Sequence, residues 1–249
     1  MTSRVLLGVD LEILDNRAVA TLNRPEARNA IDADMVTSLH EICSVLETDP
    51  LPLVITGGPE VFAAGADISQ LRERRSLDAL AGINSGIFHR IAKLPLPTVA
   101  AISGHALGGG AELAYACDFR IGTTSVKLGN PEGQLGIMAA AGGCWRLAEL
   151  VGEVTAKEIL LAGRVLTAQE AHDVRLLNEV VDAADLMTTA HQWIDRILKS
   201  APLALRLTKL AITAPRSAHP SIDNIAQAVL FETDEKRDRM TAFLEKRPQ

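Results

Sequence analysis

Apolar and polar positions alternate in the early part of the chain in a way that predicts strands and one amphipathic helix. Residues 6–13 and 17–22 have the pattern of two strands, which a turn at Asp15-Asn16 joins into a hairpin. Asp32 stands where an N-cap residue would begin a helix that runs to about Glu47. The apolar residues of this helix recur at helical spacing: Met35, Leu39, Ile42 and Leu46. The uniformly apolar residues 53–56 predict a short buried strand.

The pattern becomes mainly helical later in the chain. We expect a helix over residues 77–94, ended by two prolines, then a buried strand over residues 98–102 and short strands over 119–122 and 126–128. Further helices are predicted over residues 145–151, 155–162, 167–173, 183–200, 203–214 and 221–246. Strands early and helices late indicate an α/β (α+β) fold. We expect a core domain of residues 1–195 and a helical region of residues 196–249.

Three consecutive glycines, Gly108 to Gly110, lie between the predicted strand 98–102 and a short predicted helix over residues 112–117. Glycines at such a junction let the backbone pass close to a ligand and leave its N–H groups free to point at that ligand. Glu112 follows two residues after Gly110, near a helix N-terminus whose dipole favours an anion. Anion-binding amides beside an ionisable side chain indicate a chemical site, although Glu112 also fits the solvated face of an amphipathic helix.

Composition narrows the class of protein. The chain has 249 residues, is 47% hydrophobic with 3% aromatic residues, and carries a formal net charge of −6. The acidic balance argues against nucleic acid as a main partner, and no uncharged run reaches membrane-spanning length. Cys43, Cys117 and Cys144 show no metal-ligand or disulfide spacing, so we expect reduced core cysteines in a cytoplasmic protein with neither a metal site nor a membrane partner.

Several segments in order resemble the crotonase (enoyl-CoA hydratase/isomerase) family. They are Phe-Ala-Ala-Gly-Ala-Asp at 62–67, Gly-His-Ala-Leu-Gly-Gly-Gly-Ala-Glu-Leu at 104–113, and Asn-Pro-Glu at 130–132 with Leu-Gly-Ile at 135–137. The likeness extends from Asn-Arg-Pro at 23–25 to residues 242–247. It implies a ClpP-like spiral of ββα units, C-terminal trimerisation helices, and a homotrimer or dimer of trimers.

The resemblance also implies a reaction. Within the family, the sequence is most similar to the enoyl-CoA hydratases. These enzymes add water reversibly and with syn geometry to a trans-2-enoyl-CoA in fatty-acid β-oxidation or related acyl-CoA metabolism. The amides of Ala66 and Gly109 would bind the thioester oxygen as an oxyanion hole. Glu132 would donate the α-proton, and Glu112 would activate the water that attacks the β-carbon. Without the resemblance, Glu132 after Pro131 also fits a turn or cap residue.

The remaining matches concern the coenzyme A part of the substrate. No metal or redox cofactor is implied, since coenzyme A belongs to the substrate. The resemblance assigns its binding to a group of residues on three segments: Arg24, Arg28, Ala64, Asp67, Ile68, Phe243 and Lys246. Arg28 and Lys246 equally fit ordinary surface charges. Relatives commonly have Pro-Gly where this chain has Ala139-Ala140, so the water site beside Ala140 is expected to be narrowed or shifted.

Two alternatives to hydration stay open at this point. The first is Δ3-Δ2 enoyl-CoA isomerisation or other enolate chemistry, in which one glutamate would carry the proton. The second is a non-catalytic acyl-CoA-binding protein, for which the Ala139-Ala140 departure is the only sequence support. The sequence does not indicate the acyl chain length, the metabolic pathway or whether the assembly is a trimer or a hexamer.

Overall fold

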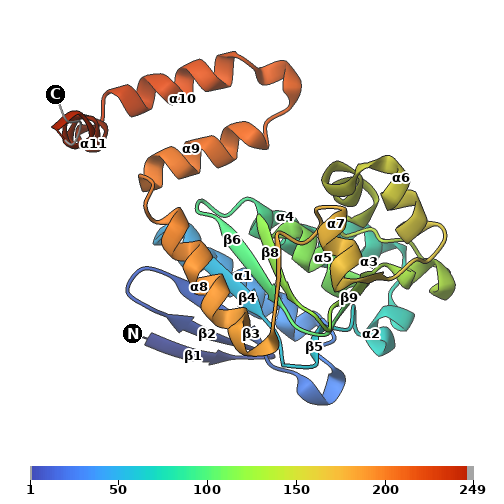
Figure 1. Ribbon diagram of the computed structural model, residues 1–249. Coiled ribbons are helices and arrows are strands. Elements are labelled where there is room, and N and C mark those ends of the chain that lie inside the picture. The colour runs from blue at the N-terminus through green and yellow to red at the C-terminus, as the bar shows by residue number, and fades with distance from the viewer. Residues whose placement is uncertain (1, 246–249) are drawn as a thin grey trace.

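A seven-stranded sheet forms the centre of the computed structural model, which describes residues 2–245 (Figure 1). Its first three strands are antiparallel, and from β3 onward neighbouring strands run parallel. In spatial order the strands are β1 (Thr2–Leu6), β2 (Val9–Ile13), β3 (Ala18–Leu22), β4 (Leu53–Thr56), β6 (Thr98–Ile102), β8 (Phe119–Thr123) and β11 (Glu179–Val181). The parallel strands are buried throughout most of their length, as their apolar runs predict.

A second, four-stranded sheet is built from very short strands that continue the turns of the spiral. In spatial order they are β10 (Leu166–Thr167), β9 (Lys127–Gly129), β7 (His105–Leu107) and β5 (Val61–Ala63). The chain passes from β6 into β7 at Gly104, which has φ 60°. A Cβ atom there would lie 1.6 Å from the carbonyl oxygen of Glu60, so this turn requires glycine. The turn brings the glycine-rich segment beside β5.

Helices cover both faces of the large sheet. One face packs against α1 (Ala33–Thr48), α4 (Ile83–Ala92) and α5 (Gly109–Ala116), and the other against α8 (Leu186–Ile197) (Figure 1). Asp32 caps α1 by accepting a hydrogen bond from the Met35 amide at 2.8 Å, which confirms the predicted helix start. The other helices around the pocket are α2 (Ile68–Glu73), α3 (Ser76–Ala81), α6 (Ala148–Leu160) and α7 (Ala168–Asp173).

Some predicted elements are interrupted in the structure. The helix expected over residues 77–94 is two helices, because Gly82 adopts φ 64° and breaks the chain direction between α3 and α4. The strand expected over 6–13 is a hairpin of β1 and β2 that turns at Gly8. Cys144 is exposed, so its prediction as a core residue was wrong; Cys43 and Cys117 are buried.

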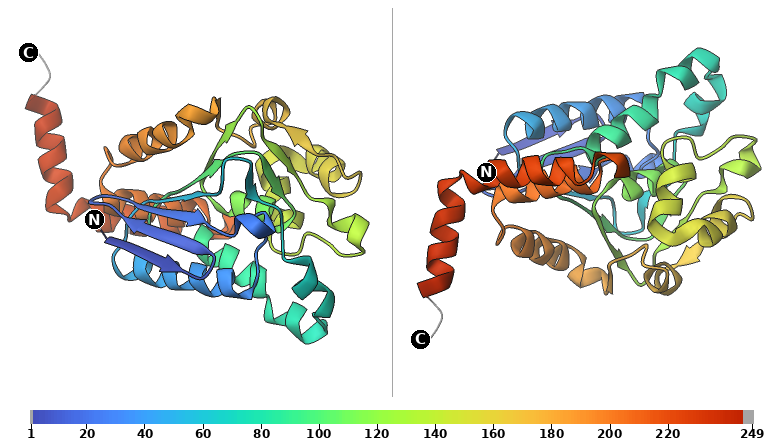
Figure 2. Two further views of the ribbon diagram at one scale, coloured as in Figure 1. Left: turned by 90° about the horizontal axis from the view of Figure 1, so that it is seen from below. Right: turned by 90° about the horizontal axis from the view of Figure 1, so that it is seen from above.

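The C-terminal helices extend away from the core as an arm. They are α9 (Pro202–Ile212), α10 (Ser221–Phe231) and α11 (Asp234–Glu245), so the single helix expected over 221–246 was wrong. None of the three buries a residue within the chain, and Figure 2 shows α11 projecting beyond the body of the molecule. The Lys209 ammonium, 2.6 Å from the Asp118 carboxylate, ties α9 to the sheet. Among residues 2–245, no helix combines the length and apolar character needed to cross a membrane.

Candidate active site

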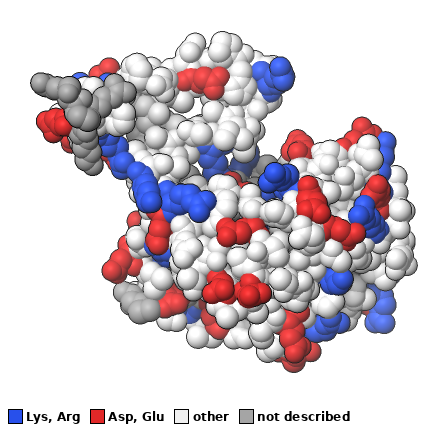
Figure 3. All heavy atoms as spheres, viewed as in Figure 1, with Lys and Arg blue, Asp and Glu red and all other residues white. Residues whose placement is uncertain are grey.

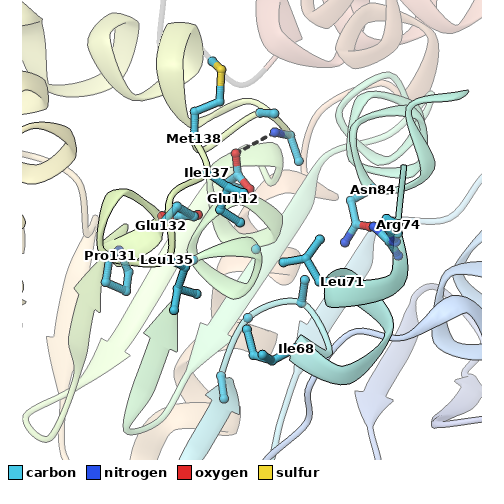
Figure 4. A pocket seen from close by; sticks show the side chains of 17 residues that line it. Ile68, Leu71, Arg74, Asn84, Glu112, Pro131, Glu132, Leu135, Ile137 and Met138 are labelled. Atoms are coloured by element: carbon cyan, nitrogen blue, oxygen red, sulfur yellow. Dashed lines mark hydrogen bonds between the residues drawn. The ribbon is translucent and has the colours of Figure 1, made fainter. Parts of the chain in front are cut away.

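A pocket opens where β5 and β7 end and α5 begins (Figure 4). Its floor is formed by main chain at Gly65, Ala66, Gly108 and Gly109, and its walls come from α2 and from the loop over residues 135–141. Ordinary side chains at the floor would fill the space, and a Cβ at Gly110 would lie 2.2 Å from the Ala63 carbonyl oxygen. The glycines of the sequence motif therefore let α5 and β5 approach each other across the site.

Two main-chain amides lie together at the bottom of this pocket. A Cβ built on Gly109 would lie 3.3 Å from the Ala66 nitrogen, so the two residues are in direct contact. Ile31 forms an isolated parallel β-bridge with this segment: its amide donates to the Gly65 carbonyl, and its carbonyl accepts from the Asp67 amide. Because these two groups face Ile31, the N–H of the intervening Ala66 points to the opposite side of the strand. Gly109 is the first residue of α5, where an amide has no partner inside the helix. The main-chain amides of Ala66 and Gly109 are therefore neighbours at the floor of the pocket.

The carboxylate of Glu112 lies at the back of the pocket, and the residue is only 4% exposed. Its Oε1 accepts hydrogen bonds from the Ala141 amide at 2.7 Å and from the Gly143 amide at 2.9 Å. Burial is the largest influence and raises the pKa of Glu112 to about 7, against the opposing effect of the two amides. The carboxyl group can therefore gain or lose a proton near neutral pH.

Glu132 enters the pocket from the short helical turn Pro131–Leu135 and is also buried. Its Oε1 accepts a 3.3 Å hydrogen bond from the Asn130 side-chain amide, whereas its Oε2 has no partner in the described part of the chain. The fully buried Tyr115 donates its hydroxyl proton to Asn130 Oδ1 at 2.9 Å, which orients that amide. Burial raises the pKa of Glu132, and the Asn130 hydrogen bond opposes the shift. One carboxylate oxygen is thus left for a proton or a ligand.

The segment whose amides donate hydrogen bonds to Glu112 also contains Ala139-Ala140, where relatives commonly have Pro-Gly. Ala139 is buried, and Ala140 lines the pocket without adopting a positive φ. Positive φ values in this region occur at Gly136 (φ 74°) and Gly142 (φ 129°). A Cβ at Gly143 would lie 2.6 Å from that of Ala139, so small residues keep the loop close to Glu112. The effect of Ala140 on a bound water stays a prediction.

The chain matches the family model described as enoyl-CoA hydratase/isomerase over residues 13–249. The chain belongs to the enoyl-CoA hydratase/isomerase family. It is 37% identical to a short-chain-enoyl-CoA hydratase of Clostridium acetobutylicum, covering 97% of this chain and 96% of the relative. It is also 37% identical to a crotonyl-CoA hydratase of Syntrophomonas wolfei, with 96% of each chain covered.

Solved structures agree with this family and with the expected crotonase fold. The crystal structure of an enoyl-CoA hydratase from Bacillus anthracis superposes with a TM-score of 0.91 at 30% identity and covers 97% of both chains. An enoyl-CoA hydratase from Thermoplasma volcanium superposes with a TM-score of 0.86 at 33% identity, covering 97% of this chain and 98% of that one. The mixed α/β spiral with C-terminal helices is therefore confirmed.

The residues predicted to bind coenzyme A lie in different surroundings. Arg24 is engaged inside the protein, with its guanidinium 3.0 Å from Asp32 and 3.4 Å from Asp67. Asp67 also caps α2. The hydrogen bond that it accepts from the Ser69 side chain is the largest of several influences that lower the pKa of Asp67. Both side chains brace the loop behind the Ala66 amide.

The other residues predicted to bind coenzyme A are spread over the surface of the protein. Ala64 and the half-exposed Ile68 line the pocket, whereas Arg28 lies on a neighbouring hollow beside His105. Phe243 is 60% exposed on α11 of the arm, and Lys246 lies outside the described residues. Only some of these positions are brought together within a single chain.

Sequence reasoning missed the residues that support the two glutamates. Asn130 belongs to the Asn-Pro-Glu motif and Tyr115 to a predicted helix, and together they orient Glu132. The available signal was helical spacing, because Tyr115 lies three residues after Glu112 on α5 and so faces the same region. The amides of Ala141 and Gly143 carry no side-chain signal and could be found only from the fold.

Proposed function

We propose that this protein is an enoyl-CoA hydratase that adds water reversibly to a trans-2-enoyl-CoA and gives a 3-hydroxyacyl-CoA. The observation that carries the proposal is the position of two buried carboxyl groups, Glu112 and Glu132, in one pocket above the Ala66 and Gly109 amides. Relatives that align over nearly the whole chain are named enoyl-CoA or crotonyl-CoA hydratases, which supports the same hydro-lyase activity.

The first requirement of the reaction is a place for negative charge. When water attacks C3 of a 2-enoyl thioester, electrons move through C2 to the thioester oxygen. The adjacent Ala66 and Gly109 amides are suited to donate hydrogen bonds to that oxygen, and such donors contribute roughly 3–4 kcal/mol each to transition-state stability. The start of α5 adds the positive end of its dipole.

The second requirement is two proton transfers. In our proposal the attacking water gives a proton to Glu112 as its oxygen bonds to C3, and Glu132 gives a proton to C2. The hydrogen bonds support this division of roles, because two amides stabilise the anionic form of Glu112. Glu132 has an unpartnered Oε2 that is available to hold the proton. After one turnover Glu112 is protonated and Glu132 is ionised. Proton exchange with solvent then returns both groups to their starting states.

A hydration assay with crotonyl-CoA tests the activity directly. Loss of the enone absorbance is expected with wild-type protein, and Glu112→Gln and Glu132→Gln are each expected to lower kcat by about 10²–10⁴-fold. Glu149→Gln, an exposed glutamate on α6, is the matched control and should keep the wild-type rate.

Three results would separate the alternatives. An unaffected Glu112→Gln variant with a shifted double bond in the product would favour the isomerase. Tight acyl-CoA binding measured by calorimetry without turnover would favour a non-catalytic binding protein. Absence of hydration across several acyl chain lengths would overturn the hydratase proposal.

We further propose that the working form is a homotrimer or a dimer of trimers and that the substrate is held by its coenzyme A part. The contacts would come from Arg24, Arg28, Ala64, Asp67, Ile68, Phe243 and Lys246. Exposed apolar side chains on the arm support an assembly. A place in fatty-acid β-oxidation or related acyl-CoA metabolism and a cytoplasmic location are consistent with the proposed substrate and the cysteine pattern.

A further inference from the structure

Arg74 points into the candidate active site from the end of α2. It is half-buried, whereas its neighbours Arg72, Glu73 and Arg75 are exposed. The side chain lines the same pocket as Glu112, and Figure 4 shows it beside Asn84 at the far end of the pocket from Glu132. A charged side chain is therefore partly shielded from solvent where it lines the pocket.

The charge of Arg74 is not balanced by a carboxylate. Arg74 Nη1 donates a 2.9 Å hydrogen bond to the neutral Asn84 Oδ1, and no carboxylate oxygen within residues 2–245 lies within 4.0 Å of its guanidinium. By contrast, the partly buried Arg24 and Arg90 are paired with carboxylates. A guanidinium has five N–H donors, so most of the donors of Arg74 remain for a ligand.

The pocket continues past the glutamates toward this arginine. Arg74 and Asn84 also line an adjoining hollow at the junction of α3 and α4, and Leu71, Ile83 and Met138 form its apolar wall. Arg74, Asn84 and Met138 line both hollows, so the two lie next to each other on either side of these side chains. An acyl chain whose thioester lies on the Ala66 and Gly109 amides would pass Glu112 and continue along this wall.

We propose that Arg74, with Asn84 beside it, is a recognition site for a carboxylate at the distal end of the acyl chain. The preferred substrates would then be 2-enedioyl-CoA thioesters, in which a carboxylate replaces the terminal methyl group. A guanidinium binds a carboxylate through two parallel hydrogen bonds, and the surrounding apolar wall strengthens the attraction by excluding water. This inference rests on the proposed hydratase function for the position of the thioester.

The same ligand carries a second kind of anion, the phosphates of coenzyme A. The contact of Arg74 with the space beyond Glu112, shared with the α3–α4 hollow, favours the acyl carboxylate. The two sources are distinguishable, because every coenzyme A thioester carries the phosphates and only the dicarboxylic ones carry the distal charge.

The experiment compares hydration of methyl-ended 2-enoyl-CoA thioesters with 2-enedioyl-CoA thioesters matched in chain length, over a series of lengths. Wild-type protein is expected to have at least about a tenfold higher kcat/KM for the dicarboxylic partner at the best length. Arg74→Gln is expected to lower that selectivity ratio by about tenfold or more, and Arg74→Lys to restore part of it. Arg72→Gln, an exposed arginine of the same helix, should leave the ratio at the wild-type value.

Two outcomes would overturn the proposal. One is a wild-type preference for the methyl-ended chain at every length. The other is an equal loss of kcat/KM for all thioesters in Arg74→Gln, which would assign Arg74 to the phosphates. Binding of saturated adipoyl-CoA and hexanoyl-CoA to wild-type and Arg74→Gln protein, measured by calorimetry, tests the same selectivity without turnover. This binding comparison therefore still tests the role of Arg74 if the protein shows no hydratase activity.

Discussion

At the scale of single residues, the two buried glutamates differ in the hydrogen bonds that they accept. Glu112 accepts two from main-chain amides, and Glu132 accepts one long bond from Asn130. Amides of the main chain cannot rotate away, so Glu112 is held in one orientation. Glu132 depends on a side chain that is itself oriented by Tyr115.

The raised pKa of Glu112 predicts a specific dependence of stability on pH. Its pKa is about 7 in the folded protein against the ordinary 4.5, so the folded state binds a proton that the unfolded state has released between these values. Stability therefore falls as pH rises through this window, by on the order of 3 kcal/mol. Glu112→Gln stays neutral and should melt higher than wild type at pH 8, with a smaller difference at pH 5.

Thermal unfolding followed by circular dichroism at both pH values measures this difference. Glu149→Gln serves as the control, because its exposed side chain should change the melting temperature little and equally at both values. A difference between Glu112→Gln and wild type that stays constant with pH would contradict the assigned ionisation.

Removing the Asn130 amide should change the acidity of Glu132. Because the Asn130 hydrogen bond lowers the pKa of Glu132, Asn130→Ala is expected to raise that pKa and to move the alkaline limb of the kcat/KM profile to higher pH. Tyr115→Phe should shift the limb in the same direction by a smaller amount, since Asn130 keeps its amide. Rates of crotonyl-CoA hydration over a pH series test both variants, and an unmoved limb would exclude the Tyr115–Asn130 pair from positioning Glu132.

At the scale of elements, the junction of β5, β7 and α5 is where close packing decides the site. A Cβ on Gly110 would lie 2.2 Å from the Ala63 carbonyl oxygen, so Gly110→Ala forces α5 away from β5. We expect a loss of about 2 kcal/mol or more in unfolding free energy, together with a loss of hydration activity because Gly109 shifts relative to Ala66.

Gly86 provides the matched control for that substitution. It lies inside α4, and a Cβ there would meet no atom within 4 Å. Gly86→Ala should therefore raise stability by about 0.5–1 kcal/mol, since alanine favours the helix. Chemical denaturation of both variants measures the difference, and equal effects would show that the helix propensity, and not the contact with β5, controls the result.

At the scale of the whole molecule, the arm of α9, α10 and α11 has no core of its own within the chain. Figure 3 shows this arm standing over the body of the protein, with a hollow between them and acidic and basic side chains mixed over the visible face. Ile225 and Val229 are 67% and 48% exposed on α10. Because exposed apolar side chains on a projecting helix are typical of an interaction surface, they support the proposed assembly.

Light scattering during gel filtration tests the expected assembly. We predict a mass of three or six times 26.6 kDa for the wild-type protein. Ile225→Glu combined with Val229→Glu should reduce that mass, because each carboxylate would be buried unpaired in the interface. Gln227→Glu, an exposed polar position on the same helix, should keep the assembly. A monomeric wild-type protein would contradict the prediction.

The sequence by itself determined the family, the mixed α/β class, the capped helix after Asp32 and the positions of the glycine motif and the two glutamates. These follow from local patterns, since hydrophobic periodicity, capping and glycine spacing act over neighbouring residues. It could not determine where the long helix over 77–94 would break, because the break at Gly82 depends on how α3 and α4 close over the pocket.

Only the tertiary structure decided which groups meet around the carboxyl groups. The Ala141 and Gly143 amides reach Glu112 from about thirty residues away in the chain, and main-chain donors leave no trace in residue type. The same holds for the unpaired charge of Arg74, since pairing is a property of distances in space. Burial, and with it the raised pKa of Glu112, exists only once these distant segments have packed together.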